Sequence, residues 1–337
     1  MWHLRILSRS KDFRMLAKRR AIRLKGQEIE RTPLLIPSFS SKGFPDVDDI
    51  IKYSSELVDG ATLVSAYDLH YKKISPPFDF ASVIFLDSGG YEASKDMDLS
   101  DFGDKQHVAL PWTQELHEAE LAKWQPGVPS VLISYDHPQQ RIPIEEQIIR
   151  AKRMASGRDD FIREILLKPE TAIQTLLQMP DVIRNVHGFA EFDVIGVTEK
   201  EIGNSIIDRM KNIAKLRRAL DKAGLDTPIH VFGSLDTVTT PLYFLAGADI
   251  FDGLTWLRFA YHQGQTIYKQ NYGALKFGVA TKAHVIDGRC WNDNYYYMRD
   301  LELEMRRFLN GYDFSVFKYH GTLFESALQN AMEEIGG

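Results

Sequence analysis

Hydrophobic residues gather in eight short runs between residues 34 and 256, and longer stretches of mixed polarity separate them. Each run is continuously apolar rather than alternating, which is typical of parallel strands buried on both faces. The pattern predicts strands over 34–40, 62–68, 82–90, 130–138, 163–169, 193–199, 229–234 and 249–256.

The stretches between these runs predict helices. Residues 46–57 follow Pro45 and carry apolar residues at helical spacing. Residues 143–154 begin with a proline and acids, which is a helix-start pattern. Residues 206–220 place their apolar side chains along one stripe, and the pattern stops at Gly224.

Repeated strand and helix units predict a single (β/α)₈ barrel over residues 1–256, with an open doubly wound sheet as the alternative. The barrel is favoured because polar residues end nearly every predicted strand on one side, whereas an open sheet would concentrate them at one switch point. Residues 257–337 predict a C-terminal helical extension packed on the barrel. The polar residues at the strand ends are Asp87, Asp136, Lys168, Glu199, Ser234 and Asp252.

The composition is that of a globular protein, with 44% hydrophobic and 26% charged residues. No apolar run approaches the ~18 residues of a membrane span, and the N-terminus lacks a signal-peptide pattern. We therefore expect a cytoplasmic protein without a membrane partner. The single cysteine, Cys290, cannot form an internal disulfide.

Charge is distributed unevenly along the chain. The formal net charge is −5, yet residues 1–26 hold nine basic residues and one acid. A basic segment on an acidic body favours a polyanion partner, although a solvated surface segment has the same composition. Arg19, Arg20 and Arg23 are the candidate contacts to a nucleic-acid backbone.

Three acids at strand ends are the candidate chemical groups. Asp87 in FLDSGGY ends an apolar strand, so desolvation raises its pKa toward the range of a general acid or base. The alternative is that Asp87 only caps a turn. Asp136 in SYDHP and Asp252 in DIFDGLTW have the same placement. Two positioned carboxylates are the minimum for chemistry at a glycosidic carbon.

Other chemistries find no support in the sequence. There is no Walker A motif and no G-x-G-x-x-G, so NTPase and dinucleotide chemistry are not indicated. The ten histidines show no metal-binding spacing, and we interpret them as buried and hydrogen-bonded.

Four segments together resemble the tRNA-guanine transglycosylase superfamily, which includes the queuine and archaeosine tRNA-ribosyltransferases. RTPLLIPSFSSKGF (31–44) is similar to the family's first barrel strand, and LDSGGYE (86–92) to its D-S-G-G-[FY]-Q motif. SYDHP (134–138) resembles its substrate-site strand. Residues 230–258 resemble the family's Gly-x-Asp-x-Phe-Asp block, with an arginine six residues beyond the last aspartate.

The resemblance implies a role for each matching residue. Asp252 would be the nucleophile that attacks C1′ of a guanosine, and Asp87 the acid and base. Asp136 would bind the N1 and amino edge of the purine, and Tyr91 would stack on it. The remaining implied substrate contacts are Ser88, Gly89, Gly90, Gly196, Val197, Gly233 and Arg258.

This sequence also departs from the family pattern. Glu92 replaces a glutamine, and Lys168-Pro169 stands where the family has a base-contacting Gln-Gly. The family's C-terminal zinc site is missing, since only Cys290 and His320 remain. One thiol and one histidine are too few for a closed zinc site, so we expect no metal and no other cofactor.

The expected function is guanine exchange in a nucleic acid. The partners would be DNA or tRNA, with DNA favoured, and a free 7-deazaguanine base; the target nucleotide would be flipped into the barrel mouth. One alternative is a non-catalytic subunit that binds nucleic acid or a catalytic partner. A second alternative is a barrel glycosidase acting on small molecules, and an oligomer is compatible with all three.

Overall fold

The computed structural model describes residues 15–94, 107–125, 127–136 and 140–336. Residues 1–14, which hold part of the basic N-terminal segment, lie outside the described residues, as do residues 137 and 138 of the predicted fourth strand.

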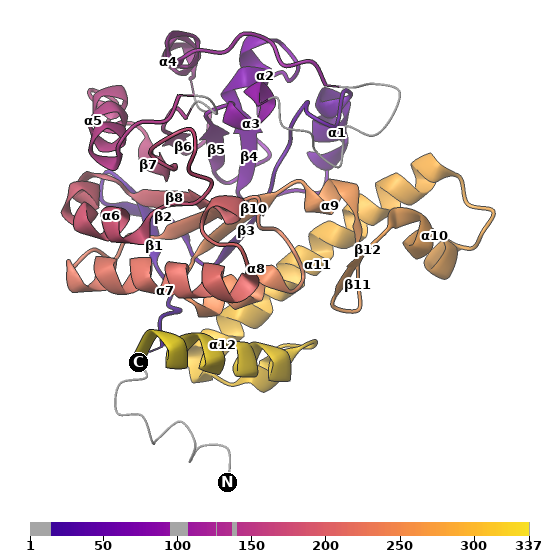
Figure 1. Ribbon diagram of the computed structural model, residues 1–337. Coiled ribbons are helices and arrows are strands. Elements are labelled where there is room, and N and C mark those ends of the chain that lie inside the picture. The colour runs from indigo at the N-terminus through magenta and orange to yellow at the C-terminus, as the bar shows by residue number, and fades with distance from the viewer. Residues whose placement is uncertain (1–14, 95–106, 126, 137–139, 337) are drawn as a thin grey trace.

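An eight-stranded parallel sheet forms the centre of the molecule (Figure 1). Its order is β3-β10-β9-β8-β7-β6-β5-β4, and a parallel bridge between Ser38 and Leu63 joins the two outer strands into a nearly closed barrel. The predicted barrel is confirmed in this form, and the open sheet is wrong. The strands are β3 (Leu34–Pro37), β4 (Thr62–Ser65), β5 (Ile84–Asp87), β6 (Ser130–Ile133), β7 (Ile162–Leu167), β8 (Val194–Thr198), β9 (Ile229–Phe232) and β10 (Ile250–Gly253).

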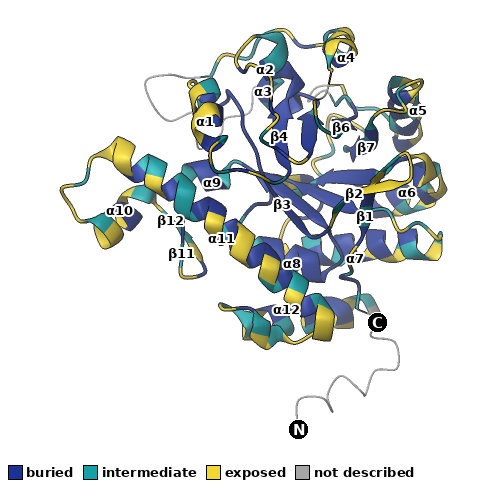
Figure 2. Ribbon diagram, turned by 180° about the vertical axis from the view of Figure 1, so that it is seen from behind, coloured by how far each residue is buried: buried dark blue, intermediate teal, exposed yellow. Residues whose placement is uncertain are grey.

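Helices cover the outside of the barrel, and Figure 2 shows buried strands at the centre with exposed residues on the outer helix faces. The three helices expected between strands form close to their predicted limits, as α1, α5 and α7. The helices between the strands are α1 (Val47–Ser54), α2 (Ala66–His70), α3 (Gly90–Ala93), α4 (Gln114–Lys123), α5 (Ile144–Ala155), α6 (Met179–Arg184), α7 (Ile206–Lys222) and α8 (Thr239–Leu245).

A hairpin that the sequence did not predict covers the amino-terminal mouth of the barrel. It consists of β1 (Ala21–Leu24) and β2 (Gln27–Arg31), and Ile22 joins the apolar cluster inside the barrel. Arg20, just before it, is 1% exposed and binds Asp249, with 2.7 Å between Nη1 and Oδ1. Asp249 directly precedes β10, so the hairpin lies at the end opposite the carboxyl ends of the strands.

This placement changes the interpretation of the basic segment. Arg20 is enclosed by carboxylates and cannot reach a phosphate, which corrects the expectation for this residue. Arg19 donates hydrogen bonds to the carbonyl oxygen of Arg306 and to Asn310, and Arg23 is exposed on β1. Their proposed phosphate contacts stay predictions, but both residues lie at the amino-terminal end of the barrel.

The C-terminal extension begins at the carboxyl ends of the strands and then runs back along the barrel (Figure 1). The long helix α11 packs against β3, and α12 packs on α7 and α8. No helix in the described part of the chain is long and apolar enough to cross a membrane. The extension contains α9 (Thr255–Arg258), β11 (Ala260–His262), β12 (Gln265–Ile267), α10 (Lys269–Phe277), α11 (Ala283–Gly311) and α12 (Gly321–Gly336).

Candidate active site

One large cavity, of about 480 Å³, opens at the carboxyl ends of the barrel strands. Asp87, Asp136 and Asp252 all line it, from β5, from the segment after β6 and from β10. The size is typical of pockets that enclose a small ligand. The three acids selected from their positions in the sequence therefore share one site.

Asp252 is held by donors on both of its carboxylate oxygens. The hydroxyl of Ser38 donates to Oδ2 over 2.7 Å, and the backbone N–H of Gly233 donates to Oδ1 over 3.1 Å. The Nε2 atom of His230 lies 3.2 Å from Oδ1. With a donor on each oxygen and 5% exposure, the Asp252 side chain is held in one orientation at the cavity wall.

The surroundings of Asp87 favour its protonated form. Burial raises the pKa of Asp87 well above its usual range, and the carboxylates of Glu92, Asp136 and Asp252 raise it further. The backbone N–H of Gly89 donates to Oδ2 over 3.3 Å, so Asp87 also makes the turn contact considered above. A carboxyl group with a raised pKa keeps its proton to higher pH, which suits a general acid.

Asp136 is kept ionised although it is equally enclosed. Burial alone would raise the pKa of Asp136, but Lys168, a hydrogen bond from Ser88 and the charge of Arg141 together lower it. The Nζ atom of Lys168 lies 3.3 Å from Oδ2 of Asp136. A side chain at Gly90 would place its Cβ 2.6 Å from this carboxylate, so glycine is needed there. Asp136 is therefore a hydrogen-bond acceptor whose orientation is set by Lys168 and Ser88.

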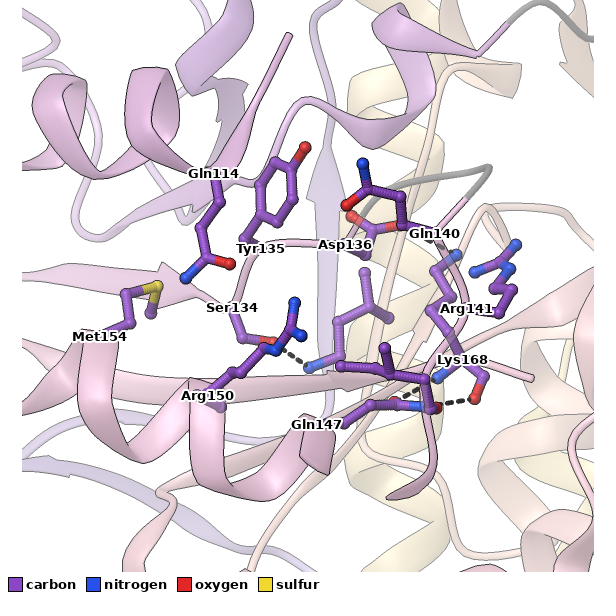
Figure 3. A pocket seen from close by; sticks show the side chains of 13 residues that line it. Gln114, Ser134, Tyr135, Asp136, Gln140, Arg141, Gln147, Arg150, Met154 and Lys168 are labelled. Atoms are coloured by element: carbon purple, nitrogen blue, oxygen red, sulfur yellow. Dashed lines mark hydrogen bonds and ion pairs between the residues drawn. The ribbon is translucent and has the colours of Figure 1, made fainter. Parts of the chain in front are cut away.

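Figure 3 shows Asp136, Arg141 and Lys168 together at the carboxyl ends of β6 and β7. They line a side pocket of about 40 Å³ that shares these residues with the large cavity. Lys168 also donates to Thr198 over 2.8 Å and to Glu201 over 3.1 Å. This volume holds water but no group as large as a purine ring.

Tyr91 lies at the cavity wall between two cations. Its hydroxyl accepts a hydrogen bond from Nη2 of Arg258 over 2.7 Å. The Nζ atom of the buried Lys42 lies 4.8 Å from the centre of the Tyr91 ring and donates to the Tyr91 carbonyl oxygen. These contacts fix the ring in one orientation, as a residue that stacks on a base requires.

The other expected contact residues divide into two groups. Ser88, Gly90, Gly233 and Arg258 line the cavity, whereas Gly89, Gly196 and Val197 are not among the residues at its wall. The N–H of Gly233 is already used by Asp252.

Glu92, one of the departures from the family pattern, lies beside Asp87. The hydroxyls of Ser40 and Ser65 donate to its two oxygens. Burial, together with the charge of Asp68, raises the pKa of Glu92 to about 7. A protonated glutamic acid has the shape and one of the donor functions of the glutamine it replaces.

Cys290 and His320 stand where the resembled family has zinc ligands, and both have other partners here. Cys290 lies in an apolar cluster with Tyr272 and Ile286, and burial raises the pKa of its thiol to about 12. The Nε2 atom of His320 lies 2.8 Å from the carbonyl oxygen of Gly264. A thiol that stays protonated is a poor zinc ligand.

Sequence reasoning missed the groups that support Asp252. Ser38 follows β3, and Glu164 and His230 are polar residues inside the apolar runs of β7 and β9. Glu164 inside a run of buried residues was a sign of a buried polar contact. Its partner His230 lies 66 residues away, so the sequence did not indicate the pair.

Comparison with models of known protein families found no match to this chain, and comparison with curated proteins found no match either. The resemblance to the guanine transglycosylases therefore rests on the four sequence motifs quoted above.

Proposed function

We propose that the protein is a guanine transglycosylase that exchanges guanine in a nucleic acid for a 7-deazaguanine base. The observation that carries this proposal is the meeting of three acids with different surroundings in one cavity. Burial and neighbouring carboxylates raise the pKa of Asp87, Lys168 and Ser88 lower that of Asp136, and the Ser38 hydroxyl fixes the orientation of Asp252. Base exchange through a covalent intermediate needs an acid, an acceptor and a carboxylate nucleophile.

The reaction takes two displacements. An oxygen of Asp252 bonds to C1′ of the target nucleotide while the C1′–N9 bond breaks, and the electron pair leaves with guanine, which takes the proton of Asp87. The ionised Asp87 then accepts a proton from the incoming base, whose nitrogen attacks C1′ and releases Asp252. Two inversions retain the β-configuration, so the polymer is never cut.

Asp136 and Tyr91 would hold the base during both steps. The Asp136 carboxylate is an acceptor for the adjacent N1–H and 2-amino groups of guanine, and the ring of Tyr91 offers a stacking surface. The target nucleotide must leave its helix or loop to enter the cavity. We favour DNA over tRNA because the family's zinc-binding segment beside the tRNA is replaced here by helices.

The test is incubation of the protein with DNA and, separately, with tRNA, each carrying labelled guanine, together with candidate 7-deazaguanines. The expected result is release of label from one polymer, and this names the substrate. Binding of a polymer without release points to a non-catalytic subunit. Release of base from free nucleosides alone points to a small-molecule glycosidase and contradicts the proposal.

The proposed reaction requires no metal. Elemental analysis of purified, chelator-washed protein is expected to find far less than one zinc per chain with full exchange activity. One zinc per chain, and loss of activity when it is removed, would contradict this part of the proposal.

A further inference from the structure

Three ionisable side chains lie inside the barrel at the base of the cavity: Glu164 of β7, His230 of β9 and Asp252 of β10, of which Asp252 also lines the cavity. Each is two residues from an apolar side chain of the cluster inside the barrel. Residues two apart on a strand share a face, so these three side chains also point into the barrel. Their exposed fractions are 1%, 0% and 5%. Charges so completely removed from water are tolerated only when they are paired.

His230 bridges the two carboxylates. Its Nδ1 atom lies 2.8 Å from Oε1 of Glu164, and its Nε2 atom lies 3.2 Å from Oδ1 of Asp252. A neutral imidazole carries one N–H and would turn a lone pair toward one of the two acids. The imidazolium carries an N–H on each nitrogen, so it can hydrogen-bond Glu164 and pair with Asp252. The contact with Asp252 is at ion-pair distance, without the geometry of a hydrogen bond.

In the part of the chain that the structure describes, two aromatic rings pack against the imidazole of His230. Phe232 of the same strand stacks on it at 3.9 Å between ring centres, and Phe85 of β5 meets it edge-on at 5.6 Å. The charged groups that face it are Glu164 from β7 and Asp252 from β10.

Gly196 on β8 makes this arrangement possible. β8 lies between β7 and β9 in the sheet, and Gly196 pairs with His230 in the strand register. A Cβ atom at Gly196 would lie 2.8 Å from Oε1 of Glu164 and 2.6 Å from Phe232. The missing side chain therefore lets Glu164 reach across β8 to His230.

The bridge also distinguishes the two oxygens of Asp252. Among the described residues, Oδ1 accepts the Gly233 N–H and lies 3.2 Å from Nε2 of His230, whereas Oδ2 accepts the Ser38 hydroxyl. Each carboxylate oxygen offers about two lone pairs. Oδ1 therefore faces the ring of His230, and Oδ2 keeps a lone pair for bond formation.

We infer that His230 is a positioning residue that acts as an imidazolium held by Glu164, pairs with Asp252 and presents Oδ2 to the reacting carbon. This inference rests on the proposed function. When Oδ2 bonds to C1′ and the C1′–N9 electron pair leaves with the base, Asp252 loses its charge, and His230 and Glu164 remain as a neutral pair. In the return step the imidazolium stabilises the carboxylate as it departs from C1′.

The bridge predicts a pH dependence with a definite direction. Burial alone would lower the pKa of His230, but Glu164 and Asp252 outweigh it and raise the pKa to about 9. Exchange is therefore expected to fall as the pH rises through this value. Glu164→Gln removes one of the two charges that raise the pKa, so the alkaline limb of the rate profile moves to lower pH by at least one unit.

The test that needs no activity is NMR of the full chain with ¹⁵N-labelled histidine, and His230→Gln assigns the signal. His230 is expected to show the shifts of an imidazolium at pH 7.5. His117 is an internal reference, because burial lowers the pKa of His117 to about 4 and its ring nitrogens have no hydrogen-bond partner among the described residues. A neutral His230 at pH 7.5 overturns the inference, whether or not Glu164→Gln folds.

The kinetic arm compares Glu164→Gln with His117→Gln, a buried histidine on α4 outside the cavity. The alkaline limb is expected to move for the first variant only. An unmoved limb in a folded Glu164→Gln protein contradicts the positioning role. Absence of guanine exchange on every polymer would reject the proposed function. The NMR result would still decide whether His230 is an imidazolium.

Discussion

At the scale of single residues, the site depends on carboxyl groups whose environments differ although they lie in one cavity. Asp87 has other carboxylates as neighbours, whereas Asp136 has Lys168 and a serine hydroxyl. Neighbouring charge and hydrogen bonding separate the pKa values of two groups that are both buried. This separation favours the protonated form of Asp87 and the ionised form of Asp136 in the same site.

The pKa of Glu92 predicts a pH-dependent stability. Its folded-state pKa of about 7 lies above the usual 4.5, so the stability that its protonated form contributes is present below about pH 4.5 and is lost as the pH rises through about 7. Glu92→Gln keeps the shape and cannot ionise. Relative to wild type, it should gain up to about 3 kcal/mol of unfolding free energy between pH 4.5 and pH 8.

Urea unfolding at the two pH values measures this difference. Glu56→Gln, at an exposed glutamate on the outer surface, is the control and should show the same difference from wild type at both. An identical offset for Glu92→Gln at pH 4.5 and pH 8 would show that Glu92 is ionised throughout.

At the scale of elements, the hairpin of β1 and β2 closes the barrel end that faces away from the site. Arg20 anchors it through Asp249 and Asp226, with 3.1 Å between its Nε and Oδ1 of Asp226. Asp249 in turn accepts from the N–H of Ile229 at the start of β9. Arg20 and the hairpin therefore stabilise the amino-terminal end of the barrel.

Arg20→Met tests this anchoring. Removing the arginine leaves the buried Asp249 with a more distant cation, Arg217 at 3.8 Å, so the unfolding free energy should fall by about 3–5 kcal/mol. Arg23→Met, at an exposed position on the same hairpin, should change it by less than about 0.5 kcal/mol. Chemical denaturation compares the two, and equal stability of both variants would refute the anchoring role.

The sequence predicted the eight strands because each is a run of buried apolar residues, and it predicted three site acids because they end such runs. It did not predict the β1–β2 hairpin, since AIRLKGQEIER is too charged to resemble a strand pair. It also did not predict the buried ion pairs. Arg20 meets Asp249 from 229 residues away, and such partners depend on strand order and register rather than on local pattern.

At the scale of the whole molecule, the candidate site and the described basic residues Arg19, Arg20 and Arg23 lie at opposite ends of the barrel. A polymer whose nucleotide entered the cavity, as proposed, would pass over the mouth at the carboxyl ends of the strands. Lys200 is exposed there and lines the cavity, and Arg258 lines it as well. Under the proposed function, these cations rather than Arg23 on the hairpin would contact the phosphates next to a flipped nucleotide.

Salt dependence of nucleic-acid binding tests this placement. Lys200→Gln should weaken binding and lower the log–log slope of affinity against salt by up to about one unit, as expected for one lost phosphate contact. Arg23→Gln removes the same charge at the other end and should leave the slope unchanged. A lower slope for Arg23→Gln and an unchanged slope for Lys200→Gln would contradict this placement and assign the phosphate contact to the hairpin.

The most direct test of the central claim is to trap the covalent intermediate between Asp252 and the nucleic acid. Enzyme is mixed with the polymer that releases guanine, without an incoming base, and is run on a denaturing gel, and peptide mass analysis locates the bond. Wild type should give an enzyme–polymer band with the adduct on Asp252. Asp252→Asn, which keeps the shape but lacks the charge, should bind the polymer and give no band. Exchange by Asp252→Asn at near wild-type rate, or an adduct on another residue, would contradict the account.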